Sequence, residues 1–325
     1  MTQVRPQAAK TFRAVYFKDP FALLRKIARI GPRAVRSIGF RTRNLLGRAR
    51  LIRRNVIFPL RNMLLRHRPI TVCANGLSYV LAPKGSIPLE MWSGRYFEKQ
   101  ELEFIVGRLQ PGMTFVDVGA NVGLFSIPAA KKVKHGNVYA FEPATWTFER
   151  LAKNAHLNNV RNLVSLRSAV GDYTGEAILQ INAPGKDGLN TIGKPTHEDS
   201  EVVNTERVPI TTLDEFLIQN SISHVDVMKI DVEGAELFVF RGAARLLGRP
   251  DAPLILYESG CLTEGFGYHP VETMWLLERH GYSFFVIDSR TGQILIPPSG
   301  RAYDAMVIAV KPTHPAYGTV KELAR

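Results

Sequence analysis

The residues whose types and spacing most clearly suggest chemistry lie in the stretch VDVGANVGLFS, at positions 116–126. Asp117, Gly119, Asn121 and Gly123 form a turn between an apolar strand and a helix. At such a turn, backbone N–H groups and the positive end of the helix dipole face a ligand. Glu142 ends the next strand, about 20 residues after the glycines, where its carboxylate can accept hydrogen bonds from two ribose hydroxyls. The pattern predicts a site for a nucleoside-containing cofactor.

Asn121 separates two kinds of cofactor. In a dinucleotide site this position is a glycine, which lets the backbone approach a pyrophosphate. S-adenosylmethionine (SAM) has no phosphate; an asparagine amide can donate to the carboxylate of its amino-acid head, while Asp117 holds the ammonium directly or through water. Asparagine also tolerates left-handed backbone geometry better than most residues. The motif therefore favours SAM, with predicted contacts from Asp117, Gly119, Ala120, Asn121, Gly123, Glu142 and Pro143.

Three carboxylates lie at predicted strand ends beside this turn: Asp231 and Glu233 follow the fourth strand, and Glu258 ends the fifth. Methyl transfer to an alcohol needs an aligned acceptor and a group that helps to remove its proton. These carboxylates could supply the general base, or could ligate a divalent metal that holds the acceptor's oxygens, although no metal is specifically indicated. Alternatively, Asp231 holds the ammonium of SAM and Glu233 caps the following helix.

Two further side chains are candidates for proton transfer. Lys229 lies two residues before Asp231 on the same side of the strand. It either neutralises that carboxylate or acts as a catalytic lysine, as in the Lys-Asp-Lys-Glu tetrad of RNA ribose methyltransferases. The fifth strand, APLILYES, lacks the second lysine of that tetrad, which disfavours the RNA interpretation. His269, in the loop after the fifth strand, is a candidate general base, but its place before a helix is equally typical of a structural residue.

The elements that must position these residues alternate from Met113 onward. Near-continuous apolar strands separated by helices predict an α/β doubly wound fold with a mostly parallel sheet covered on both faces. Strands are expected over 114–120, 137–143, 162–170, 226–234, 252–259, 282–288 and 305–310, and helices over 121–133, 145–159, 235–248 and 269–281.

Two segments do not follow this alternation: one lies before it in the sequence, and the other is inserted within it. Asn75-Gly76 between two apolar runs predicts a type I′ hairpin, followed by a helix from about Glu98 to Pro111. Residues 174–212 predict two strands around a loop rich in glycine and proline, an inserted lid in which Asn190 and Thr191 contact the substrate. Trp92, Tyr96 and Phe97 could cover the cofactor, stack on a sugar or simply pack.

Together, VDVGANVGLFS, YAFEP, RSAVGD, VDVMKIDVEGAELFVFRGA and LILYES resemble the FkbM-type SAM-dependent methyltransferases over roughly residues 85–312. The resemblance implies a class I methyltransferase (Rossmann-like) sheet of seven strands whose last strand is antiparallel. It also implies O-methylation of hydroxyls, often on sugars of glycans, lipid-linked saccharides or secondary metabolites. Asp117, Gly119, Asn121, Gly123 and Glu142 map onto the family's cofactor positions. The end of the third strand would flank the adenine with Ser168, Ala169 and Val170, with Asp172 as a further contact.

Positive charge is concentrated at the N-terminus. Residues 1–70 contain 18 Lys and Arg, 15 of them Arg, and one acid, Asp19, whereas residues 71–325 contain 24 basic and 28 acidic residues. Apolar residues at helical spacing between Phe12 and Arg68, with breaks at Gly31-Pro32, Gly39, Gly47 and Pro59, predict two to four short basic amphipathic helices. Such helices could lie on an anionic membrane, cap the following domain, or form part of an organellar transit peptide, which the length of the pattern disfavours.

The sequence also indicates the domain boundaries and the compartment, and which competing functions it disfavours. We expect a helical extension (1–70), a hairpin and helix (71–112), a methyltransferase domain (113–312) and a tail (313–325). Cys73 and Cys261 form no metal-binding or disulfide pattern, and no apolar run is long enough to span a membrane. We therefore expect a cytoplasmic protein, with a peripheral position at the membrane surface as the alternative. A nucleic-acid methyltransferase is disfavoured, because N-P-P-Y and Pro-Cys motifs are missing. A non-catalytic SAM-fold binding protein is the third alternative.

Overall fold

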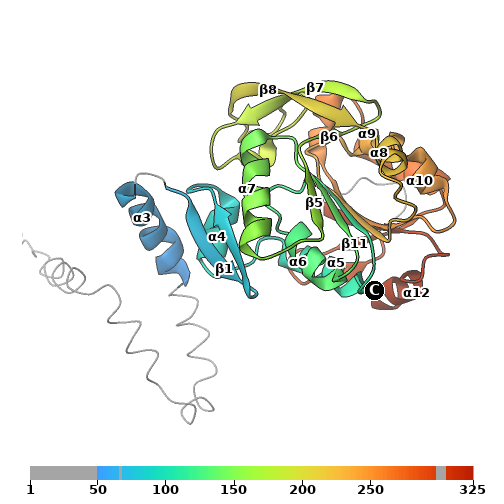
Figure 1. The fold of residues 1–325 in the computed structure, drawn as a ribbon, viewed down its shortest axis with the longest axis horizontal. Coiled ribbons are helices and arrows are strands. Elements are labelled where there is room, and N and C mark those ends of the chain that lie inside the picture. Colours follow the sequence, from blue (N-terminus) through green and yellow to red (C-terminus); the bar gives the residue numbers. More distant parts are fainter. Residues whose placement is uncertain (1–49, 66–67, 298–304, 325) are drawn as a thin grey trace, which may run out of the picture. The chain divides into compact units, whose positions relative to one another are not determined.

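The computed structural model describes residues 50–65, 68–297 and 305–324, and the chain from Arg53 onward forms one compact unit. Figure 1 shows the fold of the chain. Within these ranges the central sheet has the strand order β12-β11-β13-β10-β9-β3-β4-β5. The strands are β3 (Phe115–Val118), β4 (Val138–Phe141), β5 (Leu163–Leu166), β9 (Val227–Ile230), β10 (Leu254–Ser259), β11 (Ser283–Ile287), β12 (Ile294–Leu295) and β13 (Ala305–Val310).

The direction of the strands confirms the predicted class I methyltransferase fold. Neighbours from β5 to β10 are parallel, whereas β13 is antiparallel to both β10 and β11. The order therefore contains the seven expected strands with an antiparallel last strand. The two-residue strand β12 adds an eighth at the edge beside β11, which the seven-stranded prediction did not include.

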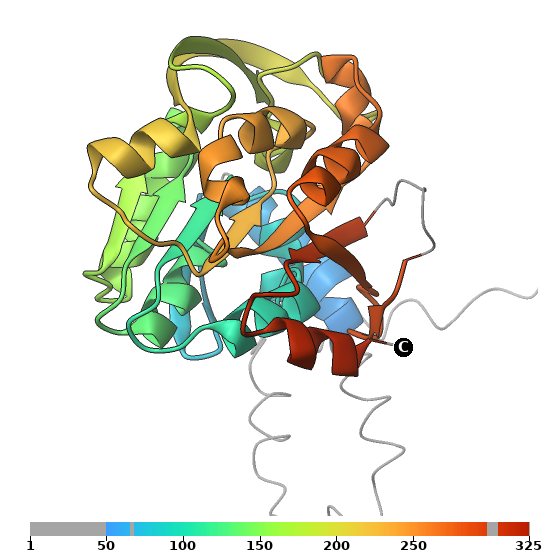
Figure 2. The same ribbon diagram turned by 90° about the vertical axis from the view of Figure 1, so that its right-hand side faces the viewer.

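Helices cover both faces of the sheet because its strands are apolar on both sides. Phe115, Leu254 and Ile308 face one core, with α5 (Lys99–Arg108), α6 (Ser126–Val133) and α12 (Tyr317–Leu323). Val116 and Ile255 face the other, with α8 (Leu213–Gln219), α9 (Glu236–Arg241), α10 (Ala244–Gly248) and α11 (Pro270–Arg279). Figure 2 shows helices on either side of the strands. α7 (Thr145–Leu157) packs beside β5 and the N-terminal hairpin.

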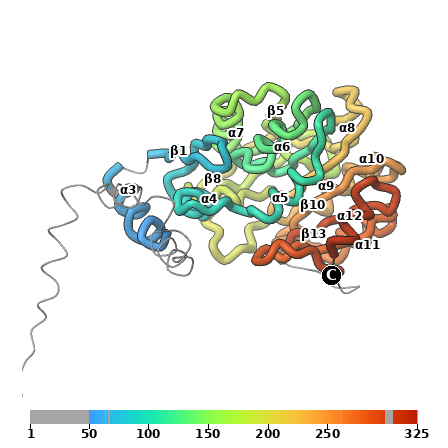
Figure 3. The backbone as a smooth tube through the Cα atoms, turned by 90° about the horizontal axis from the view of Figure 1, so that it is seen from below, coloured from blue at the N-terminus to red at the C-terminus, as the bar shows by residue number. Residues whose placement is uncertain are grey.

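The hairpin at Asn75-Gly76 is confirmed. β1 (Ile70–Ala74) and β2 (Leu77–Leu81) are antiparallel, and Asn75 and Gly76 both have positive φ, 51° and 76°. Asn154 of α7 and Asn158, the residue directly after this helix, accept hydrogen bonds from the backbone of β2, at 2.7 and 2.8 Å. The next helix, α4 (Ser86–Trp92), lies beside β1 (Figure 3).

The predicted strand over 162–170 was wrong as a single element. The chain leaves the central sheet after β5, and β6 (Ala169–Val170) pairs with the inserted β8 (Val202–Thr211), which in turn pairs with β7 (Gly175–Asn182). Residues 169–170 thus join a separate three-stranded sheet because the insertion supplies their partner. In Figures 1 and 2, β7 and β8 lie at the top of the view.

Three predicted helices have different bounds. The helix expected over 121–133 begins only at Ser126, since residues 121–125 are turns around the glycines. The helix expected over 235–248 breaks into α9 and α10 at Gly242, where a Cβ atom would lie 2.0 Å from the carbonyl oxygen of Gly171. Pro59 does not break a helix: it lies in the first turn of α3 (Phe58–Leu64), directly after the π-helical turn η3 (Arg53–Ile57). The other helices expected before residue 50 lie outside the described residues.

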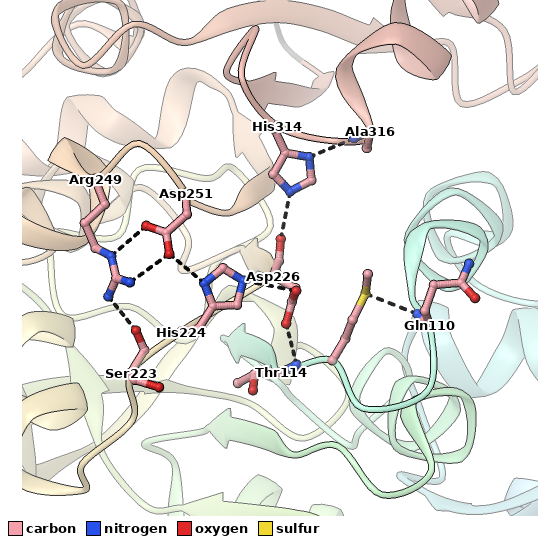
Figure 4. Close-up of polar contacts among 10 residues, drawn as sticks. Gln110, Thr114, Ser223, His224, Asp226, Arg249, Asp251, His314 and Ala316 are labelled. Carbon is pink, nitrogen blue, oxygen red and sulfur yellow. Dashed lines mark hydrogen bonds and ion pairs between the residues drawn. The ribbon is translucent and has the colours of Figure 1, made fainter.

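At the amino ends of the strands, a polar network ties three connections together (Figure 4). The ring of His224 lies 3.1 Å from a carboxylate oxygen of Asp226 and 3.0 Å from one of Asp251. The other oxygen of Asp226 accepts a hydrogen bond from the backbone of Thr114, at 2.8 Å, and Arg249 donates two hydrogen bonds to Asp251. This network fixes the starts of β3, β9 and β10, and so fixes the register of the strand ends that carry the site.

Among the described residues, no helix combines the length and the apolar composition that crossing a membrane requires.

Candidate active site

A cleft of about 660 Å³ opens at the carboxyl ends of β3, β4, β9 and β10. Its floor is the turn after β3, and its walls come from the segment before β3 and from the insertion between β6 and β9. The predicted residues that line it are Gly119, Ala120, Asn121, Glu142, Pro143, Ser168, Ala169, Val170, Lys229, Asp231, Glu233 and Glu258. The fold therefore brings together, in one cleft, side chains from positions spread over 140 residues of the sequence.

The turn after β3 has the left-handed geometry that its sequence predicts. Asn121 has a φ of 49°, and its side-chain oxygen accepts a hydrogen bond from the N–H of Val122, at 2.8 Å. That bond orients the amide, so its NH2 group is the half that can donate to a ligand. The backbone N–H of Asn121 donates to Glu142, at 3.0 Å, which links the turn to the end of β4.

The two glycines of the turn serve different purposes. Gly119 has a φ of 82°, and a Cβ atom there would lie 1.8 Å from the carbonyl oxygen of Asp231. Any side chain would push the turn away from the end of β9. Gly123 has a φ of 90° and would meet the side chains of Leu151 and Ile127, so it allows close packing of the helix layer rather than contact with a ligand.

Asp117 is completely buried beneath the turn and does not line the cleft. It accepts a hydrogen bond from the hydroxyl of Ser126, and its other oxygen lies 4.0 Å from the ammonium of Lys229. Burial raises the pKa of Asp117, while Lys229 and Ser126 act in the opposite direction. The motif predicts that Asp117 holds a ligand ammonium directly or through water. The direct contact is not available in this conformation, because Asp117 does not line the cleft.

Glu142 is almost fully buried at the base of the cleft. Each carboxylate oxygen accepts one backbone N–H, from Asn121 and from Ala144, both at 3.0 Å. Burial raises the pKa of Glu142 to about 7, although these two hydrogen bonds favour the charged form. Each oxygen keeps a second lone pair, so a pair of adjacent hydroxyls could donate to this carboxylate.

At the other side of the turn, Asp231, Glu233 and Glu258 form a group whose carboxylate oxygens lie within 4.8 Å of one another. Burial and the neighbouring Asp231 raise the pKa of Glu233 to about 9. The same Asp231, followed by burial, raises the pKa of Glu258 well above its ordinary value. Within the part of the chain that the structure describes, no side chain caps the first turn of α9, so Glu233 is not the helix cap proposed as the alternative. Glu236 accepts the backbone N–H of Val232, in the turn before the helix, at 3.0 Å. Carboxylates this close together favour a cationic ligand.

Lys229 is buried and bridges the acids. Its ammonium donates to Asp231 at 2.9 Å and to the carbonyl oxygen of Gly119 at 3.2 Å. Burial alone would lower the pKa of Lys229, but the carboxylates of Asp231, Asp117 and Glu98 outweigh it and raise the pKa above its usual value. A lysine held in the charged form cannot accept a proton, so the geometry supports the neutralising role rather than that of a catalytic base.

Glu98 lines the cleft with its neighbour Phe97 and was not among the predicted site residues. Glu98 has a left-handed backbone, with a φ of 49°, immediately before α5. Burial and then the charge of Asp231 raise the pKa of Glu98 to about 8. A non-glycine residue in this region is strained, and such strain is often found at functional sites. No local motif marks this residue, because only the fold brings it to Asp231.

The insertion contributes a wall that includes Asn190 and Thr191, as predicted, and also Asp187, which was not. The hydroxyl of Thr191 donates to the carbonyl oxygen of Glu233, at 3.1 Å. A Cβ atom on Gly85 would lie 2.4 Å from the carbonyl oxygen of Gly185, so the tip of the insertion meets the segment before α4 backbone to backbone. The insertion therefore bridges the two sides of the cleft.

Asp187 is backed by Arg150, which does not itself line the cleft. Arg150 is 5% exposed, and its guanidinium lies over the ring of Trp146 and 3.7 Å from a carboxylate oxygen of Asp187. After burial, which is the main cause, Asp187 is among the groups that raise the pKa of Glu142. Two acids from separate elements thus lie at the same end of the cleft.

Four predicted candidates are placed elsewhere. His269 is exposed and caps α11: its ring accepts the N–H of Val271 at 3.3 Å, and Glu272 accepts the N–H of His269 at 2.9 Å. Asp172 is exposed and does not line the cleft. Tyr96 packs with Tyr79 and hydrogen-bonds the carbonyl oxygen of Leu124, while Trp92 packs against Phe58.

Comparison with known proteins now identifies the family. Residues 117–284, just over half of the chain, match the family model described as the methyltransferase FkbM domain. The chain belongs to the FkbM methyltransferase family. Its fold and the motifs quoted from the sequence agree with this assignment.

Three curated relatives illustrate the range of the family. The hexuronic acid methyltransferase AglP of Haloferax volcanii is 27% identical over 160 residues, which cover 49% of this chain and 62% of AglP. The 31-O-demethyl-FK506 methyltransferase FkbM of Streptomyces tacrolimicus is 30% identical over 158 residues, which cover 41% of this chain and 60% of that relative. Methyltransferase 1 of Beauveria bassiana is 30% identical over 145 residues, which cover 39% of this chain and 57% of that relative. The matches span about three fifths of these relatives' length.

Proposed function

We propose that this FkbM-family protein is a SAM-dependent O-methyltransferase that modifies a hydroxyl of a sugar, in a glycan, a lipid-linked saccharide or a secondary metabolite. The observation that carries the proposal is the cleft itself: a left-handed Asn121 turn lies between the Glu142 carboxylate and the acids around Asp231. Two relatives support the acceptor class, since their names record methylation of a hexuronic acid and of a demethylated FK506.

The residues of the cleft fit the parts of SAM. Glu142 is placed to accept hydrogen bonds from the ribose hydroxyls, with Asp187 as a second acid at that end. Ser168, Ala169 and Val170 line the cleft beyond Pro143, where their backbone groups would flank the adenine. The amide of Asn121 and the N–H groups of its turn suit the carboxylate, and Asp231 suits the ammonium. Asp117 then makes no direct contact with SAM. It lies beneath the turn and helps to hold Lys229 and Ser126 in position.

SAM supplies a methyl group on a positively charged sulfur. The protein must hold the acceptor oxygen in line with that methyl and receive the hydroxyl proton as the new O–C bond forms. Glu233 and Glu258 line the cleft beside Asp231, and their raised pKa values make them basic enough to accept this proton once ionised. A cationic ligand nearby would favour the ionised form. The ammonium of Lys229 donates a hydrogen bond to Asp231 and so orients that carboxylate beside the cleft.

Calorimetry with SAM and S-adenosylhomocysteine tests the proposal. The intact protein should bind both, and Glu142→Ala should weaken binding at least tenfold, since it removes the ribose acceptor and releases the N–H of Asn121. Glu149→Ala is the matched control, because Glu149 is an exposed glutamate nearby on α7. If the intact protein bound neither compound, the methyltransferase proposal would fail. Incubation with radiolabelled SAM and saccharide, lipid-linked saccharide, metabolite and RNA extracts would then identify the acceptor class.

A further inference from the structure

The helix of η3 and α3, residues 53–64, is fastened to the rest of the protein by one face. Phe58 and Asn62 are buried on that face. The amide of Asn62 donates to the carbonyl oxygen of Pro83, at 2.5 Å, and the ring of Phe58 packs against Trp92 of α4. Arg54 forms an ion pair with Glu90, which is also in α4, at 3.7 Å. These contacts fix which face of the helix points away.

The opposite face is apolar and exposed. Val56, Leu60 and Leu64 recur at four-residue spacing, with exposed fractions of 57%, 48% and 66%, and Ile57 beside them is 43% exposed. We call these four residues the outer face. No residue in the described ranges covers them. Four large aliphatic side chains on one exposed helix face are more than the scattered apolar residues of an ordinary surface, and such a patch marks an interaction site.

The charge around the outer face indicates its partner. Residues 50–70 contain six arginines and no acidic residue, within an N-terminal region (1–70) whose net charge is +17. The guanidiniums of Arg53 and Arg61 lie over the ring of Trp92, at 5.6 and 5.7 Å from its centre, so both are held beside the helix. Aliphatic side chains flanked by arginines suit a surface that is apolar inside and negatively charged outside.

We propose that the outer face docks on the surface of an anionic lipid bilayer. The aliphatic side chains would enter the boundary between headgroups and acyl chains, and the arginines would lie at the level of the headgroups. This inference goes beyond methyl transfer and does not depend on it.

Docking would place the cleft near the membrane, because α4 connects the two. Trp92, the last residue of α4, contacts the helix of residues 53–64. The first turn of α4, Ser86 to Pro88, lines the cleft. A helix of seven residues is about 10 Å long. The rim of the cleft formed by α4 would thus lie within roughly that distance of the helix that contacts lipid.

Co-sedimentation of the full chain with vesicles tests the proposal. Vesicles of phosphatidylglycerol and phosphatidylcholine should bind the protein, vesicles of phosphatidylcholine alone should bind it much less, and added salt should weaken binding. The double variant Leu60→Glu/Leu64→Glu should bind the anionic vesicles at least tenfold more weakly. Ile218→Glu, which changes a residue 58% exposed on α8, is the matched control and should bind like the unaltered protein. The thermal midpoint of each variant checks that it is folded.

Each contrary result would overturn the proposal. Equal binding by the unaltered protein and the double variant would show that other arginine-rich parts of residues 1–70 bind the lipid. If the unaltered protein did not bind anionic vesicles, a lipid bilayer would be excluded as the partner of the outer face. If the double variant instead lowered the mass measured by sedimentation velocity, the outer face would bind a second copy. If it exposed residues 1–49 to protease, the outer face would be covered by the protein's own N-terminal segment.

Discussion

Among the single residues of the cleft, Asn121 combines two properties that can be separated by substitution. Its backbone is left-handed, and it lines the cleft with an amide whose oxygen accepts the N–H of Val122. Glycine adopts this backbone without strain, so Asn121→Gly preserves the turn and removes only the amide. We expect this variant to bind SAM about tenfold more weakly, the loss of one hydrogen bond to a charged group, and to gain no affinity for NAD.

Asn159→Gly is a suitable control for that experiment. Asn159 is also left-handed, with a φ of 52°, but it is exposed after α7 and does not line the cleft. Calorimetry should show unchanged SAM affinity for this variant. If Asn121→Gly also bound SAM normally, Asn121 would be present only for its backbone geometry, and the contact with the SAM carboxylate would have to come from the N–H groups of the turn.

Among the elements, the insertion depends on one buried side chain. Asn182, at the end of β7, donates to the carbonyl oxygen of Leu189 at 2.6 Å and accepts hydrogen bonds from the hydroxyl of Ser200 and the N–H of Glu201, at 2.8 and 2.6 Å. These bonds join the two ends of the loop that carries Asp187. The loop should therefore lose its conformation when this amide is removed.

Asn182→Ala should loosen the loop without unfolding the domain. The two large cores lie on the faces of the central sheet, away from this amide, so we expect only a small change in the thermal midpoint. Limited proteolysis should cut residues 183–201 faster, and SAM affinity should fall several-fold as Asp187 leaves the cleft. Asn204→Ala, on the exposed side of β8, should change neither quantity. Unaltered proteolysis of Asn182→Ala would show that the contacts of Gly185 and Thr191 hold the loop alone.

The elements also show what could be predicted from the sequence. Strands buried on both faces must be apolar throughout, and the Asn75-Gly76 turn suits only positive φ, so the sheet and hairpin were predictable from local patterns. The split between β5 and β6 was not, because it depends on pairing with β8, some 40 residues away. Glu98 was missed, and the direct contact considered as one of two possibilities for Asp117 is not available, for the same reason: packing of distant segments decides which carboxylates reach the cleft.

Across the folded chain, buried acids around the cleft make stability depend on pH. The pKa of Glu142 and of Glu236 is raised by burial to about 7, and burial with neighbouring acids raises that of Glu98 to about 8 and that of Glu233 to about 9. In the unfolded chain glutamate has a pKa of about 4.3. The folded protein therefore binds more protons than the unfolded chain between these values, and its stability must fall as pH rises through this window.

We expect the thermal midpoint of the ligand-free protein to fall by about 5 °C or more between roughly pH 5.5 and 9, as these acids ionise side by side. SAM carries a net positive charge and S-adenosylhomocysteine does not, so SAM should raise the midpoint more at the higher pH, and by more than S-adenosylhomocysteine does. Glu98→Gln/Glu233→Gln, which mimics the protonated pair, should flatten the profile, whereas Glu103→Gln on the exposed side of α5 should leave it unchanged. A midpoint that rose with pH, or an equal slope in the double variant, would mean that these acids are already ionised at neutral pH and that Lys229 compensates their charge.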